Sequence, residues 1–289
     1  MTETTEELAR VRLGPGDAAA AFELSAEAGW NQTVLDWQLM LDDGEAIGQR
    51  SADGRLVASA LLLPYGERLA WIAMVLTTEE FRRRGLATAN LQWTLERCRA
   101  RGLIAGLDAT PDGSEVYRPL GFEAVCGLQR LRAERAAVTR PSRGEVAIRP
   151  LQAARDLDAI ARLDAGVFGI DRRRLLDYLR RNQPQRALLA EGEGRLSGFV
   201  LARAGRRALH IGPLVAQSPL VARLLLAQAL VDADGPVSID VPDERTKFLA
   251  MLQDAGFAPL RPFTRMLQGP PAALGDMTTC FAIAGPEFG

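Results

Sequence analysis

The sequence predicts an α/β (α+β) fold in two tandem copies of one domain, each a mixed, mainly antiparallel twisted sheet with flanking helices. The first observation is the element order strand, two helices, three strands, helix, strand, helix, strand, which periodicity and turn residues indicate for the first half. The second is that this order starts again after a polar, arginine-rich stretch. We therefore expect a first domain at 1–132, a linker at 133–145 and a second domain at 146–289.

The composition is that of an ordinary globular protein. The chain has 289 residues, more than one average domain, of which 47% are hydrophobic and 25% charged. A net charge of −1 argues against a general nucleic-acid binder, which carries a basic excess. The first ten residues, MTETTEELAR, lack the apolar core of a secretion signal, and no apolar run is long enough to span a membrane. We therefore expect a cytoplasmic protein with neither nucleic acid nor membrane as a partner, and the oligomeric state stays open.

Cysteine and histidine are too scarce to suggest a metal site. Cys98, Cys126 and Cys280 are widely spaced and odd in number, which favours buried thiols in a reducing compartment over a disulfide framework. His210 is the only histidine, so a histidine metal site or a Ser-His-Asp hydrolase would depend on that single residue. We expect no metal.

Local signals define the elements of the first domain around its centre. An acid in the first turn and a glycine after the last turn bound the first helix. An Asp-Gly turn between two apolar runs predicts a hairpin. Before the centre we expect a strand at 9–13, helices at 15–28 and 34–41, and paired strands at 45–51 and 56–63. After it we expect a strand at 104–109, a short helix starting at 114–117 and a closing strand at 122–131.

The centre of the first domain is a strand, a basic glycine loop and a helix start. Residues 71–76, WIAMVL, form a short apolar run, which predicts a strand buried on both faces. The loop RRRG at 82–85 follows, where Gly85 permits a positive φ or a close backbone approach. A helix start presents unpaired N–H groups and a partial positive charge, so this unit predicts a phosphate site. The alternative is a solvated arginine cluster beside a chain-breaking glycine. The apolar positions of the helix are Ala87, Leu91, Leu95 and Cys98.

Two motifs in this region resemble the GNAT superfamily of N-acetyltransferases. RRRGLA at 82–87 is similar to the R/Q-x-x-G-x-G/A pyrophosphate loop of that family, and YRPLGF at 117–122 is similar to its Y-x-x-x-G-F ending. Each motif alone is a weak signal, whereas strand, loop, helix, strand and ending in this order are a strong one. The chain departs from the family pattern at Thr110, where asparagine is frequent, and at Gly113, where alanine is frequent. Cofactor contacts from Thr110 therefore stay open.

The resemblance implies a cofactor site in the first domain. It implies that acetyl-CoA is the cosubstrate and that an amine accepts the acetyl group, without a metal. By resemblance, the backbone of Val75, Leu76 and Thr77 binds the pantetheine arm. The residues implied for the pyrophosphate are Arg83, Arg84, Gly85, Leu86, Ala87 and Thr88.

The resemblance also implies catalytic and acceptor residues. Tyr117 is the general acid that protonates the leaving thiolate, and ring packing is the alternative role. Trp30 and Asn31, between the first two helices, are candidate acceptor contacts, with packing and helix capping as the alternative. A general base stays unassigned among three acids near strand ends, Asp108, Glu45 and Glu123.

The second copy keeps the pattern of the first without its motifs. Its fourth strand, HIGPLV at 210–215, continues through Ala-Gln-Ser-Pro into an apolar helix at 220–231, with no glycine loop. Pro219 suits a helix start but has no N–H for a pyrophosphate. Leu252 stands where Tyr117 stands in the first copy. This half resembles the degenerate C-terminal domain of tandem GNAT proteins, so we expect one acetyl-CoA site per chain.

Three classes of function compete. The motifs favour an N-acetyltransferase that acts on a primary amine of a small molecule or peptide. A transferase of the same fold with another acyl-CoA is the second class, because the loop recognises only the CoA phosphates. A non-catalytic CoA-binding or regulatory module is the third, because one copy has already lost its motifs.

Overall fold

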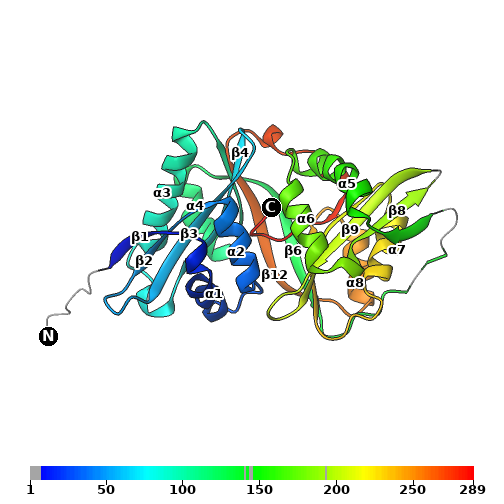
Figure 1. Ribbon diagram of the computed structural model, residues 1–289, viewed down its shortest axis with the longest axis horizontal. Coiled ribbons are helices and arrows are strands. Elements are labelled where there is room, and N and C mark those ends of the chain that lie inside the picture. Colours follow the sequence, from blue (N-terminus) through cyan, green and yellow to red (C-terminus); the bar gives the residue numbers. More distant parts are fainter. Residues whose placement is uncertain (1–7, 140, 143–145, 193) are drawn as a thin grey trace. The chain divides into compact units, whose positions relative to one another are not determined.

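The computed structural model describes residues 8–139, 141–142, 146–192 and 194–289. Its contacts divide the chain into two compact units (Figure 1). Unit 1 extends to Leu107 and includes Phe288, and unit 2 comprises residues 108–287 and Gly289. The predicted linker falls partly outside the described residues, at 140 and 143–145, and so does most of the N-terminal stretch, at 1–7.

Unit 1 is built on a mixed sheet in the strand order β1-β2-β3-β4-β5. Neighbouring strands are antiparallel except β4 and β5, which are parallel. Helices α1 and α2 pack against each other and against β3, and α3 packs on β2, β3 and β4. The bounds are β1 Ala9–Leu13, α1 Ala18–Glu27, α2 Val34–Asp43, β2 Glu45–Arg50, β3 Leu56–Tyr65, β4 Leu69–Thr77, α3 Leu86–Ala100 and β5 Ile104–Ala109.

The helix boundaries of unit 1 follow from capping side chains. Residues Pro15–Asp17, predicted as the first turn of a helix, form a separate 3-10 turn, in which the Asp17 carboxylate accepts a hydrogen bond from Gly14 N (2.8 Å). The α2 helix begins after Thr33, whose hydroxyl accepts from Asp36 N (3.3 Å) while the Asp36 carboxylate accepts from Thr33 N (2.7 Å). This reciprocal pair satisfies N–H groups that a helix start otherwise leaves unpaired.

Unit 2 contains the elements of the second copy together with the short helix α4 and the closing strand of the first. Its strand order is β7-β8-β9-β10-β11-β6-β12, with β13 beside β10. Pairs are antiparallel except β10 and β11. The bounds are α4 Pro111–Tyr117, β6 Glu123–Ala133, β7 Ala147–Pro150, α5 Ala153–Phe168, α6 Arg173–Asn182, β8 Leu188–Gly192, β9 Arg195–Arg203, β10 Leu209–Ala216, α7 Pro219–Ala229, β11 Val237–Pro242, α8 Thr246–Asp254, β12 Ala258–Gln268 and β13 Cys280–Ala282.

The closing strand β6 lies between two strands of the second copy. It pairs with β11 on one side and with β12 on the other, antiparallel in both cases. It continues to Ala133, the first residue of the predicted linker. The domain boundaries at 132 and 146 stay a prediction. The strand pairing shows that β6 is a strand of the sheet of unit 2.

The mixed, mainly antiparallel sheets with flanking helices confirm the predicted fold class. Large apolar side chains fill the core of each unit, including Trp37 and Trp71 in unit 1 and Phe199 in unit 2, all without exposed surface. Among the described residues, no helix is long and apolar enough to cross a membrane.

Candidate functional site

A bulge interrupts β4 just beyond its pairing with β5. The parallel pairing covers residues 69–71 of β4 and stops there. Two residues of β4, Met74 and Val75, then lie opposite one residue of β3, which defines a β-bulge. Met74 has a φ of 53°, and the hydroxyl of Ser59 donates a hydrogen bond of 2.8 Å to its carbonyl oxygen. The predicted pantetheine residues at 75–77 thus lie beyond the paired part of β4 and β5.

The loop from β4 to α3 is left-handed at two residues. Arg83 has a φ of 61° and Gly85 a φ of 76°. A Cβ atom on Gly85 would meet no atom within 4 Å. Of the two roles predicted for this glycine, the structure shows the positive φ, which L side chains rarely adopt, and open space around the residue.

The start of α3 leaves its N–H groups without side-chain partners. Gly85 is the N-cap, and no side chain within the described part of the chain caps the helix. The first three N–H groups, of Leu86, Ala87 and Thr88, have no intrahelical acceptor in an α-helix. The N–H of Ala89 is the first to bond within the helix, to Gly85 O at 2.9 Å. A helix start of this kind is a binding site for an anion.

At the corresponding helix start in the second copy, most of the N–H groups are capped or missing. Ser218 is the N-cap of α7, and its hydroxyl accepts a hydrogen bond from Val221 N at 3.3 Å. Pro219 occupies the first position of the helix and has no N–H. Only the N–H of Leu220 therefore lacks an acceptor within the first turn, compared with three at α3. Leu252, at the position equivalent to Tyr117, is fully buried in an apolar core cluster.

Three arginines flank the α3 start, and all three are exposed. Arg82 Nε donates to Thr77 O at 3.5 Å, and Arg84 donates to Glu80 O at 3.3 Å while its guanidinium lies 4.6 Å from the centre of the Phe81 ring. These contacts keep Arg82 and Arg84 beside the loop, and none of the three arginines forms an ion pair with a carboxylate of a described residue. The loop and helix start therefore form a positive region suited to a phosphate group.

Tyr117 ends the short helix α4 in unit 2. Its half-buried ring lies 6.0 Å from the ring of Phe122, centre to centre, at an angle of 54°. Burial raises the pKa of the Tyr117 hydroxyl to about 12, because water is removed from the site of the phenolate charge. Among the described residues none hydrogen-bonds to this hydroxyl. Tyr117 is thus a protonated phenol throughout the neutral range.

The two positions at which the sequence departs from the family pattern both shape α4. Thr110 is the N-cap of this helix, and its hydroxyl accepts from Gly113 N at 3.2 Å. A Cβ on Gly113 would lie 3.0 Å from Cε2 and 3.3 Å from Cζ of Tyr117. Glycine at 113 therefore leaves room for the Tyr117 ring, and the Thr110 hydroxyl is engaged in capping.

The candidate acceptor residues lie in the α1–α2 connection of unit 1. The Trp30 side chain is half-buried, and the main-chain N–H of this residue donates to Ser25 O at 2.8 Å. Asn31 is buried, but the N-cap of α2 is Thr33, so the alternative role of Asn31 as a helix cap is wrong. Trp37 of α2 is packed in the core, and its indole N–H donates to Ser25 Oγ at 3.0 Å.

Two of the three acids considered as general bases are held in ion pairs. Glu45 contacts Arg97 at 2.5 Å and Arg101 at 2.8 Å. Asp108 is buried and accepts two hydrogen bonds from Arg265, at 2.9 and 2.8 Å. Glu123 is exposed at the start of β6. The geometry therefore leaves the general base unassigned.

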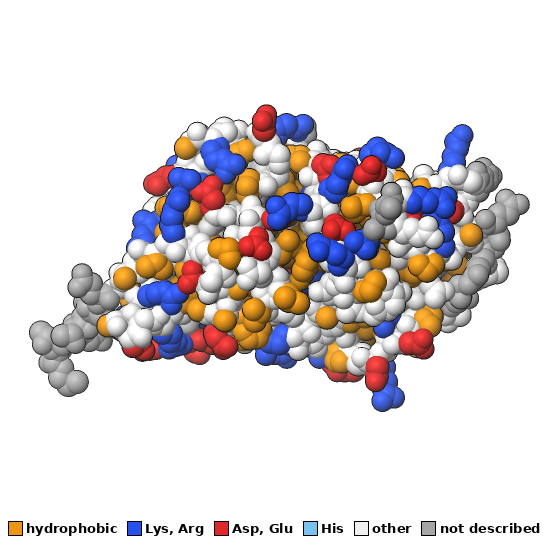
Figure 2. Space-filling view, viewed as in Figure 1, with side chains coloured by type: hydrophobic (Ala, Val, Ile, Leu, Met, Phe, Trp, Pro, Cys, Tyr) orange, Lys and Arg blue, Asp and Glu red, His pale blue; other side chains and the backbone are white. Residues whose placement is uncertain are grey.

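Charges of both signs are interspersed on the face of the molecule shown in Figure 2, and neither sign gathers into a continuous stripe there. This distribution agrees with the net charge of −1.

Two protein-family models match the chain. An "Acetyltransferase (GNAT) family" model matches residues 17–122, and an "Acetyltransferase (GNAT) domain" model matches residues 160–282. Each match falls in one of the two copies recognised from the sequence.

Relatives match the chain over most of its length. An uncharacterized N-acetyltransferase, YitH, of Bacillus subtilis is 25% identical over 249 residues, which are 86% of each protein. The crystal structure of a putative acetyltransferase from Pyrococcus horikoshii has a TM-score of 0.78 at 20% identity, covering 99% of this chain and 98% of that one. A tandem GNAT protein of the clavulanic acid biosynthesis pathway has a TM-score of 0.65 at 17% identity, covering 91% and 99%. These two structures share the fold of this chain.

Proposed function

The chain belongs to the GNAT acetyltransferases and carries two GNAT domains in tandem, and from this premise we propose that its first copy binds acetyl-CoA and transfers the acetyl group to a primary amine. The acceptor is a small molecule or a peptide. The second copy does not bind the cofactor.

The observation that carries this proposal is the difference between the two equivalent helix starts. At α3 three N–H groups have neither an intrahelical acceptor nor a side-chain cap from the described residues, and the N-cap is a glycine with a φ of 76°. At α7 a serine hydroxyl and a proline remove two of the three. A pyrophosphate needs several N–H donors at short range. We assign it to Gly85, Leu86, Ala87 and Thr88, with Arg83 and Arg84 adding electrostatic attraction.

The bulged segment of β4 supports the assignment of the pantetheine arm. Residues 75–77 lie past the point where β4 and β5 are paired, so strand geometry leaves room for hydrogen bonds from a ligand. In the reaction, such backbone N–H groups would also stabilise the negative charge that develops on the thioester oxygen.

We assign proton transfer to Tyr117. Direct attack of a neutral amine on the thioester forms a C–N bond and breaks the C–S bond. The attacking nitrogen gives up one proton to solvent, and the thiolate that leaves takes one from Tyr117. A phenol whose pKa is raised to about 12 is fully protonated at neutral pH, so the hydroxyl carries a proton to share with the sulfur as the C–S bond breaks. The motif position supports this role. Trp30 and Asn31 are the proposed acceptor contacts.

Isothermal titration calorimetry of the full chain with acetyl-CoA tests the cofactor assignment. We expect one molecule bound per chain, and no binding after Gly85→Val. The matched control is Gly54→Val, because Gly54 also has a positive φ (85°) and open space but lies in the β2–β3 turn. Two equivalent sites per chain, or normal binding by the Gly85 variant, would contradict the assignment.

The same loop is compatible with another acyl-CoA. The rise in melting temperature that acetyl-CoA produces can be compared with the rise that longer acyl-CoAs produce. A larger rise with a longer acyl-CoA would identify that compound, and not acetyl-CoA, as the donor.

A further inference from the structure

The groove beside β10 in unit 2 is occupied by the chain itself. Like β4, strand β10 pairs in parallel with the next strand over three residues, 209–211, and then has a bulge in which Gly212 and Pro213 face one residue of β9. Just beyond this bulge, β13 pairs with β10, placing Ala282 opposite Leu214 and Cys280 opposite Val215. Ile283 N then donates to Asp240 O of β11 at 3.0 Å. Residues 280–283 of the segment 280–289 thus pair with both strands at the point where β10 and β11 have separated.

Burial and packing fix this segment along its length. Residues 280–284 are each at most 3% exposed. Arg245, at the start of α8, donates to Cys280 O at 2.8 Å, and its guanidinium lies 4.9 Å from the centre of the Phe281 ring. The Phe281 ring meets Phe248 of α8 edge-on, with centres 5.2 Å apart. A Cβ on Gly212 would lie 2.0 Å from Ile283 O, so the strand and the segment are in direct contact.

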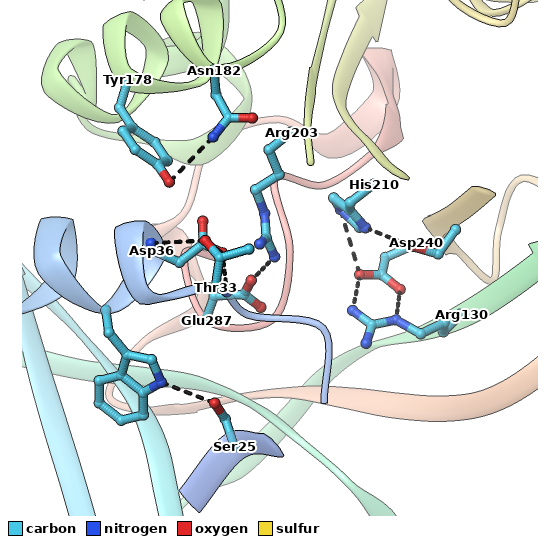
Figure 3. A network of polar contacts seen from close by, with 12 residues as sticks. Ser25, Thr33, Asp36, Arg130, Tyr178, Asn182, Arg203, His210, Asp240 and Glu287 are labelled. Carbon is cyan, nitrogen blue, oxygen red and sulfur yellow. Dashed lines mark hydrogen bonds and ion pairs between the residues drawn. The ribbon is translucent and has the colours of Figure 1, made fainter. Parts of the chain in front are cut away.

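Two further arginines hold the end of the segment. Arg203, at the end of β9, forms a buried ion pair with Glu287 (Figure 3). Arg172 donates to the main-chain oxygen of Gly289 and is itself paired with Asp164. Charged hydrogen bonds in a buried place are strong and directional, so the contacts favour an extended apolar peptide with an acid near its end.

We propose that the groove between β10 and β11 is a peptide-binding site whose resident ligand is the segment 280–289 of the same chain. The segment takes the place in the second copy that the pantetheine arm takes in the first, a comparison that rests on the proposed function. The second copy therefore excludes the cofactor twice: its helix start is capped, and its strand groove is filled from within.

A charge-reversal pair in the full chain tests the site. Glu287→Arg places a second cation against Arg203, so the segment is expected to leave the groove and the melting temperature to fall by about 5–15 °C. Adding Arg203→Glu restores an ion pair with opposite orientation, and most of this loss should be recovered. Glu67→Arg is the matched control, because it makes the same charge change at an exposed turn. If the falls in melting temperature caused by Glu287→Arg and by Arg203→Glu alone simply add in the double variant, the ion pair between the two residues is refuted.

A labelled peptide of residues 280–289 then tests whether the groove binds a peptide in trans. In the unmodified chain the resident segment competes, whereas in the Glu287→Arg chain the groove is open, so the peptide should bind the variant at least about 10-fold more tightly. Equal binding to both chains, with the variant folded by circular dichroism, would overturn the proposal.

Hydrogen exchange on the unmodified chain gives a readout that does not depend on a variant. The Ile283 amide should exchange as slowly as the amides of β10, and exchange at the rate of an unstructured peptide would refute the site. No measurement here uses acetyl-CoA, so failure of the proposed function would leave these results unchanged, and failure here would leave cofactor binding by the first copy standing.

Discussion

Arg130 donates two hydrogen bonds of 2.7 Å to the buried carboxylate of Asp240, which joins the closing strand of the first copy to the second copy (Figure 3). Arg265 stands at the equivalent place on β12, eight residues after the Gly-Phe pair in each case, and pairs with Asp108 of the first copy. Each copy therefore supplies an arginine to an aspartate of the other. Both ion pairs lie in unit 2, where β6 of the first copy lies between β11 and β12 of the second.

Breaking one of these pairs should destabilise the protein strongly. Asp240→Asn keeps the shape of the side chain but leaves the Arg130 guanidinium buried without a counter-charge, which costs about 3–5 kcal/mol of unfolding free energy. Asp158→Asn is the control, since its ion pair with Arg173 is exposed and contributes little. Chemical denaturation of both variants checks the difference, and equal losses would show that Arg130 finds another partner.

The buried histidine gives stability a defined pH dependence. Burial, opposed by Asp240, lowers the pKa of His210 from 6.5 to about 3. The folded-state pKa is thus below the unfolded one, so the stabilisation is complete above pH 6.5 and is lost as the pH falls toward 3. Because this is the only histidine, and carboxylates of the unfolded chain stay mostly ionised down to pH 5, we expect a loss of about 2 kcal/mol between pH 7 and pH 5.

Urea denaturation at pH 7, 6 and 5 measures this slope. His210→Asn provides the control, because its stability should change little over the same interval whatever its absolute value. A flat profile for the unmodified chain would mean that His210 takes up its proton in the folded state.

The sequence was informative where local patterns decide the structure. Apolar runs and turn residues predicted β1 and β5 at their observed bounds and β4 within two residues at its start. The glycine loop predicted either a positive φ or a close backbone approach at Gly85, and the structure has the positive φ. The missing loop of the second copy was visible because Pro219 and the absence of a glycine are local features.

Pairing between distant strands was not predictable in this way. Nothing in residues 122–131 specifies β11 as a neighbour, because an alternating strand pattern states which face is buried and not which strand lies beside it. Strand β13 has three residues, too few for a periodic signal, so the occupant of the β10 groove was missed. The capping role of Thr110 could have been predicted from the sequence, because threonine followed by proline is a helix-start signal.

Tyr117→Phe should lower turnover without weakening the cofactor complex. Loss of a general acid reduces the rate by about 10²- to 10⁴-fold. The hydroxyl makes no hydrogen bond with another described residue, so the dissociation constant for acetyl-CoA should stay the same. Because burial raises its pKa to about 12, Tyr117 should also cause no loss of rate up to about pH 10. Thiol release with an active amine acceptor measures turnover, and an unchanged rate with chemistry limiting would return the ring to a packing role.

Gly113→Ala should move the Tyr117 ring and so test its position separately from its hydroxyl. The new methyl group would lie 3.0 Å from Cε2 of that ring, closer than ordinary contact, so the ring must shift by a few tenths of an ångström. A shift of this size should lower turnover by about 3- to 10-fold while acetyl-CoA binding is unchanged, because proton transfer depends on alignment. Stability should change little, since the gain in helix propensity, about 1 kcal/mol, offsets the crowding. Gly166→Ala, in helix α5 with open space around the new methyl, controls for propensity alone. If turnover falls in Tyr117→Phe but not in Gly113→Ala, the ring tolerates displacement, and alignment of the hydroxyl does not limit the reaction.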